Sequence, residues 1–296
     1  MWEAEAANKR NSLVLFLVFL ACVFLLAWVF SEVSGLGSFG VALAALIAVA
    51  TTVGSYYWSD RIILAMSQAR PVEKSQNPYL YNVIEGLAIA AGIPKPGAYL
   101  IEDTAPNAFA TGRDPEHAII VVTTGLLQKL NRVELEGVIA HEMSHIRNYD
   151  IRFMMYVVVM VGVVALLSDW ILRGFFFRRK SDREGSGRGA LLLLAIGIVF
   201  AILAPLFATL IKLAISRQRE FLADATGSLL SRYPEGLASA LEKISKDKEP
   251  LEAANRATAH LYIVNPFKDL GGLAAGLLST HPPIEERIKR LRGRLT

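Results

Sequence analysis

Long apolar runs alternate with polar segments along this chain. Four of the runs reach the roughly 20 residues that a helix needs to cross the hydrocarbon core of a bilayer. They cover about 13–30, 39–58, 153–172 and 189–215. Asp169 lies in the third run, and Pro205 and Lys212 lie in the fourth, so a buried helical hairpin of a soluble core is the alternative for these two. The pattern favours four transmembrane helices.

The first run follows Lys9 and Arg10, as the apolar part of a signal peptide would. It is too long for that part, however, and no small-residue cleavage site follows it. We therefore expect residues 13–30 to form a first membrane span.

The polar segment 59–152 has a different periodicity. Apolar residues three and four apart predict a helix over about 76–92, with Leu80, Val83, Ile84, Leu87 and Ala88 facing inward. "AYLIED" and "NAFATG" are predicted as short strands, and the β-branched "AIIVVTTGLL" as a buried strand. Residues 105–124 thus resemble a hairpin whose first strand lies at the edge of a small sheet.

The N-termini of further helices can be recognised from the sequence. Asn131 is a good N-cap residue, and Glu134 three positions later completes a capping-box pattern. After the fourth apolar run, "SRQREFLADATGSLLSRY" continues as a helix, Pro234 starts another, and "PPIEERIKRL" forms a last one.

Composition supports a membrane protein. Hydrophobic residues make up 53% of the 296 residues and mean hydropathy is +0.39, which is too apolar for an ordinary soluble domain. The net charge is +4, but the basic residues flank apolar runs, so we expect lipid and no nucleic acid as partner. Cys22 is the single cysteine, which excludes an intramolecular disulfide and a thiolate metal cluster.

The helix after Asn131 contains "HEMSH", which fits the pattern H-E-x-x-H. Residues four apart share one face of a helix, so His141 and His145 can bind one metal ion, and two imidazoles suit Zn²⁺. Glu142 lies beside them and can take a proton from zinc-bound water, which then attacks a peptide carbonyl. The alternative is a chance match, but the motif falls on an independently predicted helix.

A catalytic zinc needs a third protein ligand. In the extended motif H-E-x-x-H-x-x-G-x-x-H a third histidine would stand where Ile151 stands here, so that class is excluded. The remaining candidate is a carboxylate in "REFLAD". There Glu220 can bind zinc and Asp224, one turn later, can accept the second N–H of a ligand histidine. A solvated helix face is the alternative for such an acid pair.

Three segments, "HEMSHIRNYD", "SRQREFLADATG" and "STHPPIEERIKRL", together with the four apolar runs, resemble the HtpX family of membrane zinc metalloproteases. That family is related to the zinc-type CAAX prenyl proteases, and the resemblance covers nearly the whole chain. It implies a membrane-integrated endopeptidase of protein quality control and the stress response, with a zincin-like (gluzincin) α+β catalytic domain. It also implies one Zn²⁺ per chain bound by His141, His145 and Glu220, with Glu142 as general base.

The resemblance further implies contacts with substrate. An extended substrate would pair along the edge strand that contains Asn107, Ala108 and Phe109, and strand addition tolerates many sequences. From the residues alone, Asn107 could equally shape a turn after Pro106.

Two residues near the C-terminus complete the expected site. The resemblance implies that His281 binds substrate or stabilises the oxyanion. From the residues alone, a cap ahead of the helix that Pro282 and Pro283 begin is favoured for His281. Arg287 could pair with a site carboxylate or lie on a solvated helix face.

Charge predicts the orientation in the membrane. Basic residues flank the first two runs on one side, and the loop 31–38 between them has neither Lys nor Arg. The positive-inside rule therefore places the N-terminus and the catalytic domain on the cytoplasmic side. The resemblance implies that the membrane is the plasma (inner) membrane. The basic loop 173–188 argues against this topology, because two full later spans would put it outside.

The sequence thus predicts a mainly α membrane protein with four transmembrane helices and a small-sheet catalytic domain. Its parts are an N-terminal hairpin, a first catalytic part, a second membrane or membrane-associated hairpin and a second catalytic part, over 1–58, 59–152, 153–215 and 216–296. We expect unfolded or membrane proteins as substrates, and self-cleavage by family resemblance. The alternatives are a narrow-specificity processing protease of the CAAX type and a non-enzymatic transporter or metal-binding scaffold.

Overall fold

The structure is a computed structural model of the chain. It describes residues 2–34, 37–158, 217–254, 258, 261–264, 266 and 282–293. Most of the third and fourth apolar runs, the basic loop 173–188 and His281 lie outside the described residues. The chain separates into a polar unit, with residues 1–9, 59–155 and 214–296, and an apolar unit, with residues 10–58 and 156–213.

Two long helices account for the first two apolar runs. They are α1 (Trp2–Ser34) and α2 (Gly37–Met66), and the windows Glu5–Leu25 and Gly37–Gly54 are long and apolar enough to cross a membrane. Only 12% of the second window is buried, so most of its apolar side chains face outward, as contact with lipid requires. The third run begins as helix, which is described as far as Val158.

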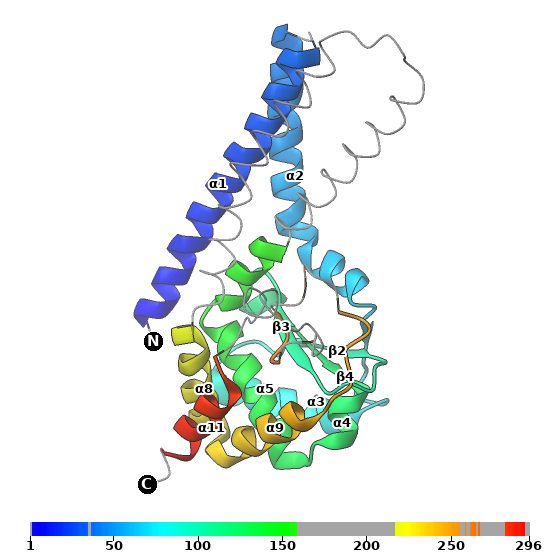
Figure 1. The fold of residues 1–296 in the computed structure, drawn as a ribbon, viewed down its shortest axis with the longest axis vertical. Helices are drawn as coiled ribbons and strands as arrows, with labels where there is room; N and C mark the ends of the chain where they lie inside the picture. Colours follow the sequence, from blue (N-terminus) through cyan, green and yellow to red (C-terminus); the bar gives the residue numbers. More distant parts are fainter. Residues whose placement is uncertain are drawn as a thin grey trace. The chain divides into compact units, whose positions relative to one another are not determined.

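The polar unit contains one mixed sheet (Figure 1). Its strands are β1 (Arg70–Pro71), β2 (Gly97–Ile101), β3 (Ala108–Thr111) and β4 (Ile119–Thr123), in the order β1-β2-β4-β3. β2 runs parallel to β4, whereas β1 and β3 are antiparallel to their neighbours. The hairpin over 105–124 is confirmed, with β3 last in the strand order.

The predicted strand "AIIVVTTGLL" is wrong in its second half. β4 ends at Thr123, and Thr124–Lys129 forms the short helix α4. The hydroxyl of Thr123 accepts a hydrogen bond from the backbone N–H of Leu126 at 3.1 Å and so caps α4. The apolar composition of the segment predicts that the strand continues here.

Helix α3 (Pro78–Ala91) matches the helix predicted over 76–92. The side chain of Asn77 caps its first turn, and Gly92, with φ of +66°, ends it in the left-handed conformation. All five apolar residues expected to face inward are buried, namely Leu80, Val83, Ile84, Leu87 and Ala88.

Helix α5 (Arg132–Arg147) is the centre of the polar unit. It begins with the predicted capping box, in which Asn131 and Glu134 bond to each other's backbone N–H groups. It packs against α3, β3, α8 (Arg217–Ser231) and α9 (Pro234–Lys246). The last helix, α11 (Ile284–Arg292), packs against α8 and α9 (Figure 1). The three helices predicted after the fourth apolar run are therefore confirmed.

Glycines allow α5 to approach its neighbours closely. A Cβ atom on Gly227 of α8 would lie 2.9 Å from the backbone nitrogen of His141, and one on Gly137 would lie 2.5 Å from the backbone nitrogen of Leu237. Such distances leave no room for a side chain. The backbones of α8 and α5 therefore meet directly beside His141.

Candidate metal centre

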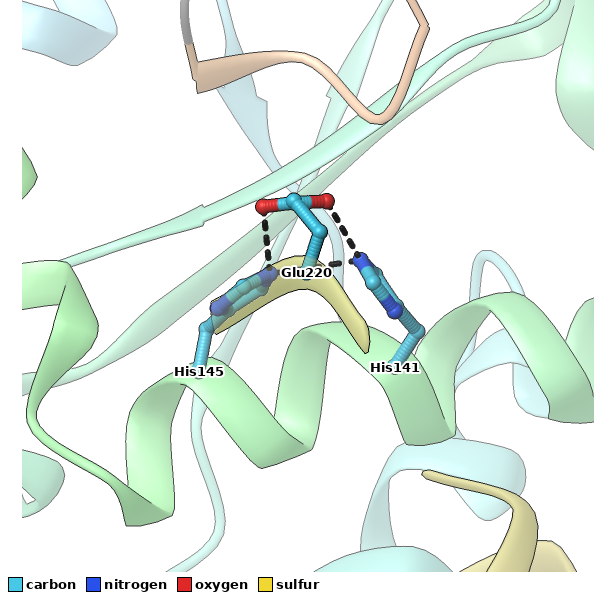
Figure 2. A group of neighbouring side chains, drawn as sticks. All are labelled: His141, His145 and Glu220. Carbon is cyan, nitrogen blue, oxygen red and sulfur yellow. Dashed lines mark hydrogen bonds and ion pairs between the residues drawn. The ribbon is translucent and has the colours of Figure 1, made fainter. Parts of the chain in front are cut away.

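Three ligand-type side chains converge in the polar unit. His141 and His145 project from one face of α5, and Glu220 comes from the first turn of α8. The Nε2 atoms of the two histidines lie 3.2 Å apart, and the oxygens of Glu220 lie 3.7 Å from His141 Nε2 and 3.6 Å from His145 Nε2. Figure 2 shows the Glu220 carboxylate between the two imidazole rings.

These distances fit a common metal ion. Two ligand atoms about 2.0–2.1 Å from a tetrahedral Zn²⁺ lie about 3.3–3.4 Å apart. The three observed separations are within a few tenths of an ångström of that value. All three residues are buried, at most 5% exposed. The donor set of two imidazoles and one carboxylate matches the catalytic zinc type, which keeps a fourth position open.

His145 is oriented by Asp150, a residue that the sequence did not single out. Nδ1 of His145 lies 3.0 Å from Asp150 Oδ2, so Nδ1–H can donate to this carboxylate and, in the neutral imidazole that a metal requires, Nε2 is left as the ligand atom. The contact depends on a sharp turn. α5 ends at Arg147, Tyr149 has φ of +59°, and helix resumes at Asp150.

His141 is oriented in the same way from the other side. Its Nδ1 lies 3.0 Å from Asp224 Oδ1, one helical turn after Glu220. Arg287 of α11 donates to both oxygens of Asp224, from Nε at 2.9 Å and from Nη2 at 2.7 Å. Arg287 is fully buried, so it does not lie on a solvated helix face. It pairs with a site carboxylate, which was the other alternative from the sequence.

The charges of this cluster shift two pKa values. Burial alone would raise the pKa of Asp224, but Arg287 and the bond with His141 outweigh it and hold the pKa far below its ordinary value. Burial alone would lower the pKa of His145, but Asp150 and Glu220 outweigh it and raise the pKa to about 9. The raised pKa of His145 reflects the surrounding buried carboxylates, whose negative charge a divalent cation would offset, whereas the lowered pKa of Asp224 reflects its pairing with Arg287 and His141.

Glu142 lies next to His141 on α5 and is 2% exposed. Its negative charge contributes to the raised pKa of His145, which places it within electrostatic range of the ligands. A buried carboxylate that is not one of the three converging ligands is the group that a proton-transfer step needs.

The residues expected to bind substrate are covered by another segment of the chain. Asn107 donates from Nδ2 to the backbone oxygen of Val264 at 3.0 Å, and the backbone N–H of Ile263 donates to Ala108 O at 2.9 Å. The ring of Phe109 packs edge-on against Tyr262, with centroids 5.0 Å apart. Residues 261–264 thus lie along the side of β3 that does not face β4.

Comparison with known proteins decides the family. The sequence model described as peptidase family M48 matches residues 74–295, which include every residue of the converging cluster. The chain belongs to peptidase family M48. Two relatives named "Protease HtpX homolog" support this, one from Dictyoglomus thermophilum with 51% identity and one from Thermoanaerobacter pseudethanolicus with 47% identity.

These M48 relatives match over nearly the full length. The first alignment covers 98% of this chain and 94% of the relative, and the second covers 99% and 97%. The crystal structure of S. mikatae Ste24p shares the fold, with a TM-score of 0.52 and 17% identity over 98% of this chain and 67% of that chain. The chain is therefore a membrane metalloprotease of the M48 family, and a non-enzymatic transporter or scaffold is not favoured.

Proposed function

We propose that this M48 protease is a zinc endopeptidase whose metal is held by His141, His145 and Glu220. The observation that carries the proposal is the convergence of their three ligand atoms in a buried site. Zinc, when bound there, would supply a Lewis acid that polarises a peptide carbonyl and lowers the pKa of a water molecule. One ion per chain suits the single buried cluster of this type among the described residues.

The residues around the metal have separate roles in this proposal. Asp224 and Asp150 each accept the Nδ1–H of one histidine and so keep both Nε2 atoms available. Glu142 accepts a proton from the attacking water on its carboxylate and passes it to the leaving amine. His281, which lies outside the described residues, is proposed to bind substrate or donate to the oxyanion, on family resemblance alone.

A substrate would bind as an extended strand along β3. The backbone oxygen of Ala108 and the side-chain amide of Asn107 already bind the backbone of residues 263–264, which supports this edge as a site that binds main-chain groups. A substrate that pairs there would take the place of 261–264. Because main-chain contacts dominate, we propose unfolded and membrane proteins as substrates, with self-cleavage as a further outcome.

The proposed location is the cytoplasmic side of a plasma (inner) membrane. The support is the positive-inside pattern around α1 and α2, which are apolar enough to span. Four spans, with the second hairpin over 153–215 crossing twice, remain part of the proposal. Recognition by a strand edge depends mainly on main-chain contacts, so it fits a narrow-specificity enzyme of the CAAX type less well.

Metal analysis of purified protein tests the ligand set. We expect one zinc per chain in the wild type, and less than a tenth of that in Glu220→Ala after dialysis. Glu136→Ala is the matched control, since Glu136 is a glutamate of α5 that pairs with Arg132 at the surface. Full zinc retention in Glu220→Ala would refute the ligand assignment.

A further inference from the structure

The turn that follows α5 is held by the beginning of α1. Asn8 is buried and donates from Nδ2 to the backbone oxygen of Asn148 at 2.9 Å and to Asp150 Oδ1 at 2.6 Å. The ammonium of Lys9 lies 4.2 Å from the centre of the Tyr149 ring. Residues 1–9 belong to the same compact unit as the metal centre, although Asn8 and Asp150 are 142 positions apart in the sequence.

Asp150 is the link between Asn8 and the metal centre. One oxygen, Oδ1, accepts from Asn8, and the other, Oδ2, contacts His145 Nδ1. The terminal torsion of an aspartate has a broad preference, so the carboxylate plane is set by its partners. A bond that fixes Oδ1 therefore also fixes the direction in which Oδ2 accepts from His145.

The bond also lowers the cost of burying Asp150, which is 1% exposed. A buried carboxylate is tolerated when its oxygens are hydrogen-bonded. Arg219 adds a positive charge 4.0 Å from Oδ1, which is beyond hydrogen-bonding distance. Asn8 thus supplies a short, directional contact where Arg219 supplies mainly charge.

We propose that Asn8 is a positioning residue for the metal ligand His145 and acts through Asp150. The docking of residues 1–9 against the turn after α5 thereby tunes the affinity of the metal centre. The inference rests on the proposed zinc site. Any event that displaces the N-terminal end of α1 would weaken metal binding without touching a ligand.

The test is the zinc dissociation constant of the full chain in detergent, measured by competition with a chromophoric chelator. Asn8→Ala removes the donor, and Asn8→Leu removes it while keeping the same number and branching of side-chain heavy atoms. Asn11→Ala is the matched control, because Asn11 is an exposed asparagine of the same helix. Far-ultraviolet circular dichroism establishes that each variant is folded.

Loss of a group bonded directly to a ligand histidine typically weakens metal binding by about 10- to 100-fold, so we expect about 3- to 10-fold for either Asn8 variant. Asn11→Ala should match the wild type. In an Asp150→Ala background, Asn8→Ala should have no further effect, because the double-mutant cycle removes the shared contact.

Two results would overturn the inference. One is a zinc affinity in both Asn8 variants equal to that of the wild type. The other is an equal loss in the presence and absence of Asp150, which would mean that Asn8 acts by another route. A wild-type chain that binds no zinc would instead refute the proposed site itself.

Discussion

Arg287 and Asp224 form a two-point ion pair inside the polar unit, with hydrogen bonds of 2.9 and 2.7 Å. Asp224 also contacts His141, so the last described helix of the chain holds the carboxylate that orients a proposed metal ligand. Arg287 further donates to the backbone oxygen of Ile263 at 3.3 Å. One buried guanidinium thus connects α11, α8 and the segment that lies on β3.

Arg287→Ala should destabilise the protein and weaken zinc binding. Removing one partner of a buried ion pair leaves the other charge unpaired, which typically costs about 3–5 kcal/mol. Thermal unfolding in detergent and zinc content measure the two effects. Lys289→Ala, an exposed position of the same helix, is the control. Equal unfolding midpoints for the two variants would contradict this role.

Gly227→Ala should separate α8 from α5. The added Cβ would meet the backbone of His141 at 2.9 Å, and overpacking of this kind typically costs about 1–3 kcal/mol. Because Glu220 and Asp224 are on the same helix, zinc affinity should fall as well. Gly86→Ala is the control: that site in α3 has open space, and alanine there should stabilise by about 0.5–1 kcal/mol. Unchanged zinc affinity in Gly227→Ala would show that the close approach is not needed.

Local patterns predicted much of this fold. The three- and four-residue spacing gave α3 and its buried face, and the capping residues gave the start of α5. Asp224 was predicted as the partner of a ligand histidine from its place one turn after Glu220, but the partner of His145 could not be predicted in the same way. Asp150 reaches His145 only because Tyr149 adopts a left-handed conformation, and Asn8 reaches Asp150 across most of the chain. Tertiary packing decides such contacts, and periodicity does not report them.

In the sheet, too, some features were predictable from local patterns and others were not. The hairpin of β3 and β4 follows from β-branched runs and a turn, whereas the two-residue β1 is too short to leave a pattern. The parallel pairing of β2 with β4 joins two strands that are not consecutive in the sequence, which local patterns do not report. Arg287 stands on a charged helix, and its sequence context gave no sign that it would be buried. Its role as the ion-pair partner of Asp224 becomes visible only in the structure.

Zinc uptake by chelator-stripped protein should release a proton at pH 7. The pKa of His145, about 9, lies above its ordinary value of 6.5, so this ligand is protonated before zinc binds. Zinc requires the neutral imidazole, and affinity should therefore rise by up to about tenfold per pH unit between pH 7 and 9. Calorimetry in buffers of different ionisation enthalpy counts the protons. Equal affinities at pH 7 and 8.5 would contradict the charged state of His145.

Substrate binding should expose residues 261–264. If an unfolded protein pairs with β3, it displaces the hydrogen bond from Ile263 N–H to Ala108 O. Hydrogen exchange of this segment, measured by mass spectrometry in a Glu142→Gln variant, should accelerate when substrate is added. Exchange in α3, away from this edge, provides the reference. Slower exchange at 261–264 would mean that substrate binds over the segment and leaves the edge occupied.

The most direct test of the central claim is cleavage by Glu142→Gln. This change keeps the shape of the side chain but removes the carboxylate that accepts a proton. We predict full zinc content with the cleavage rate of casein in detergent reduced by at least about 10²-fold, in the range that positioned acid–base groups contribute. Wild-type zinc content together with a wild-type cleavage rate in Glu142→Gln would contradict the account.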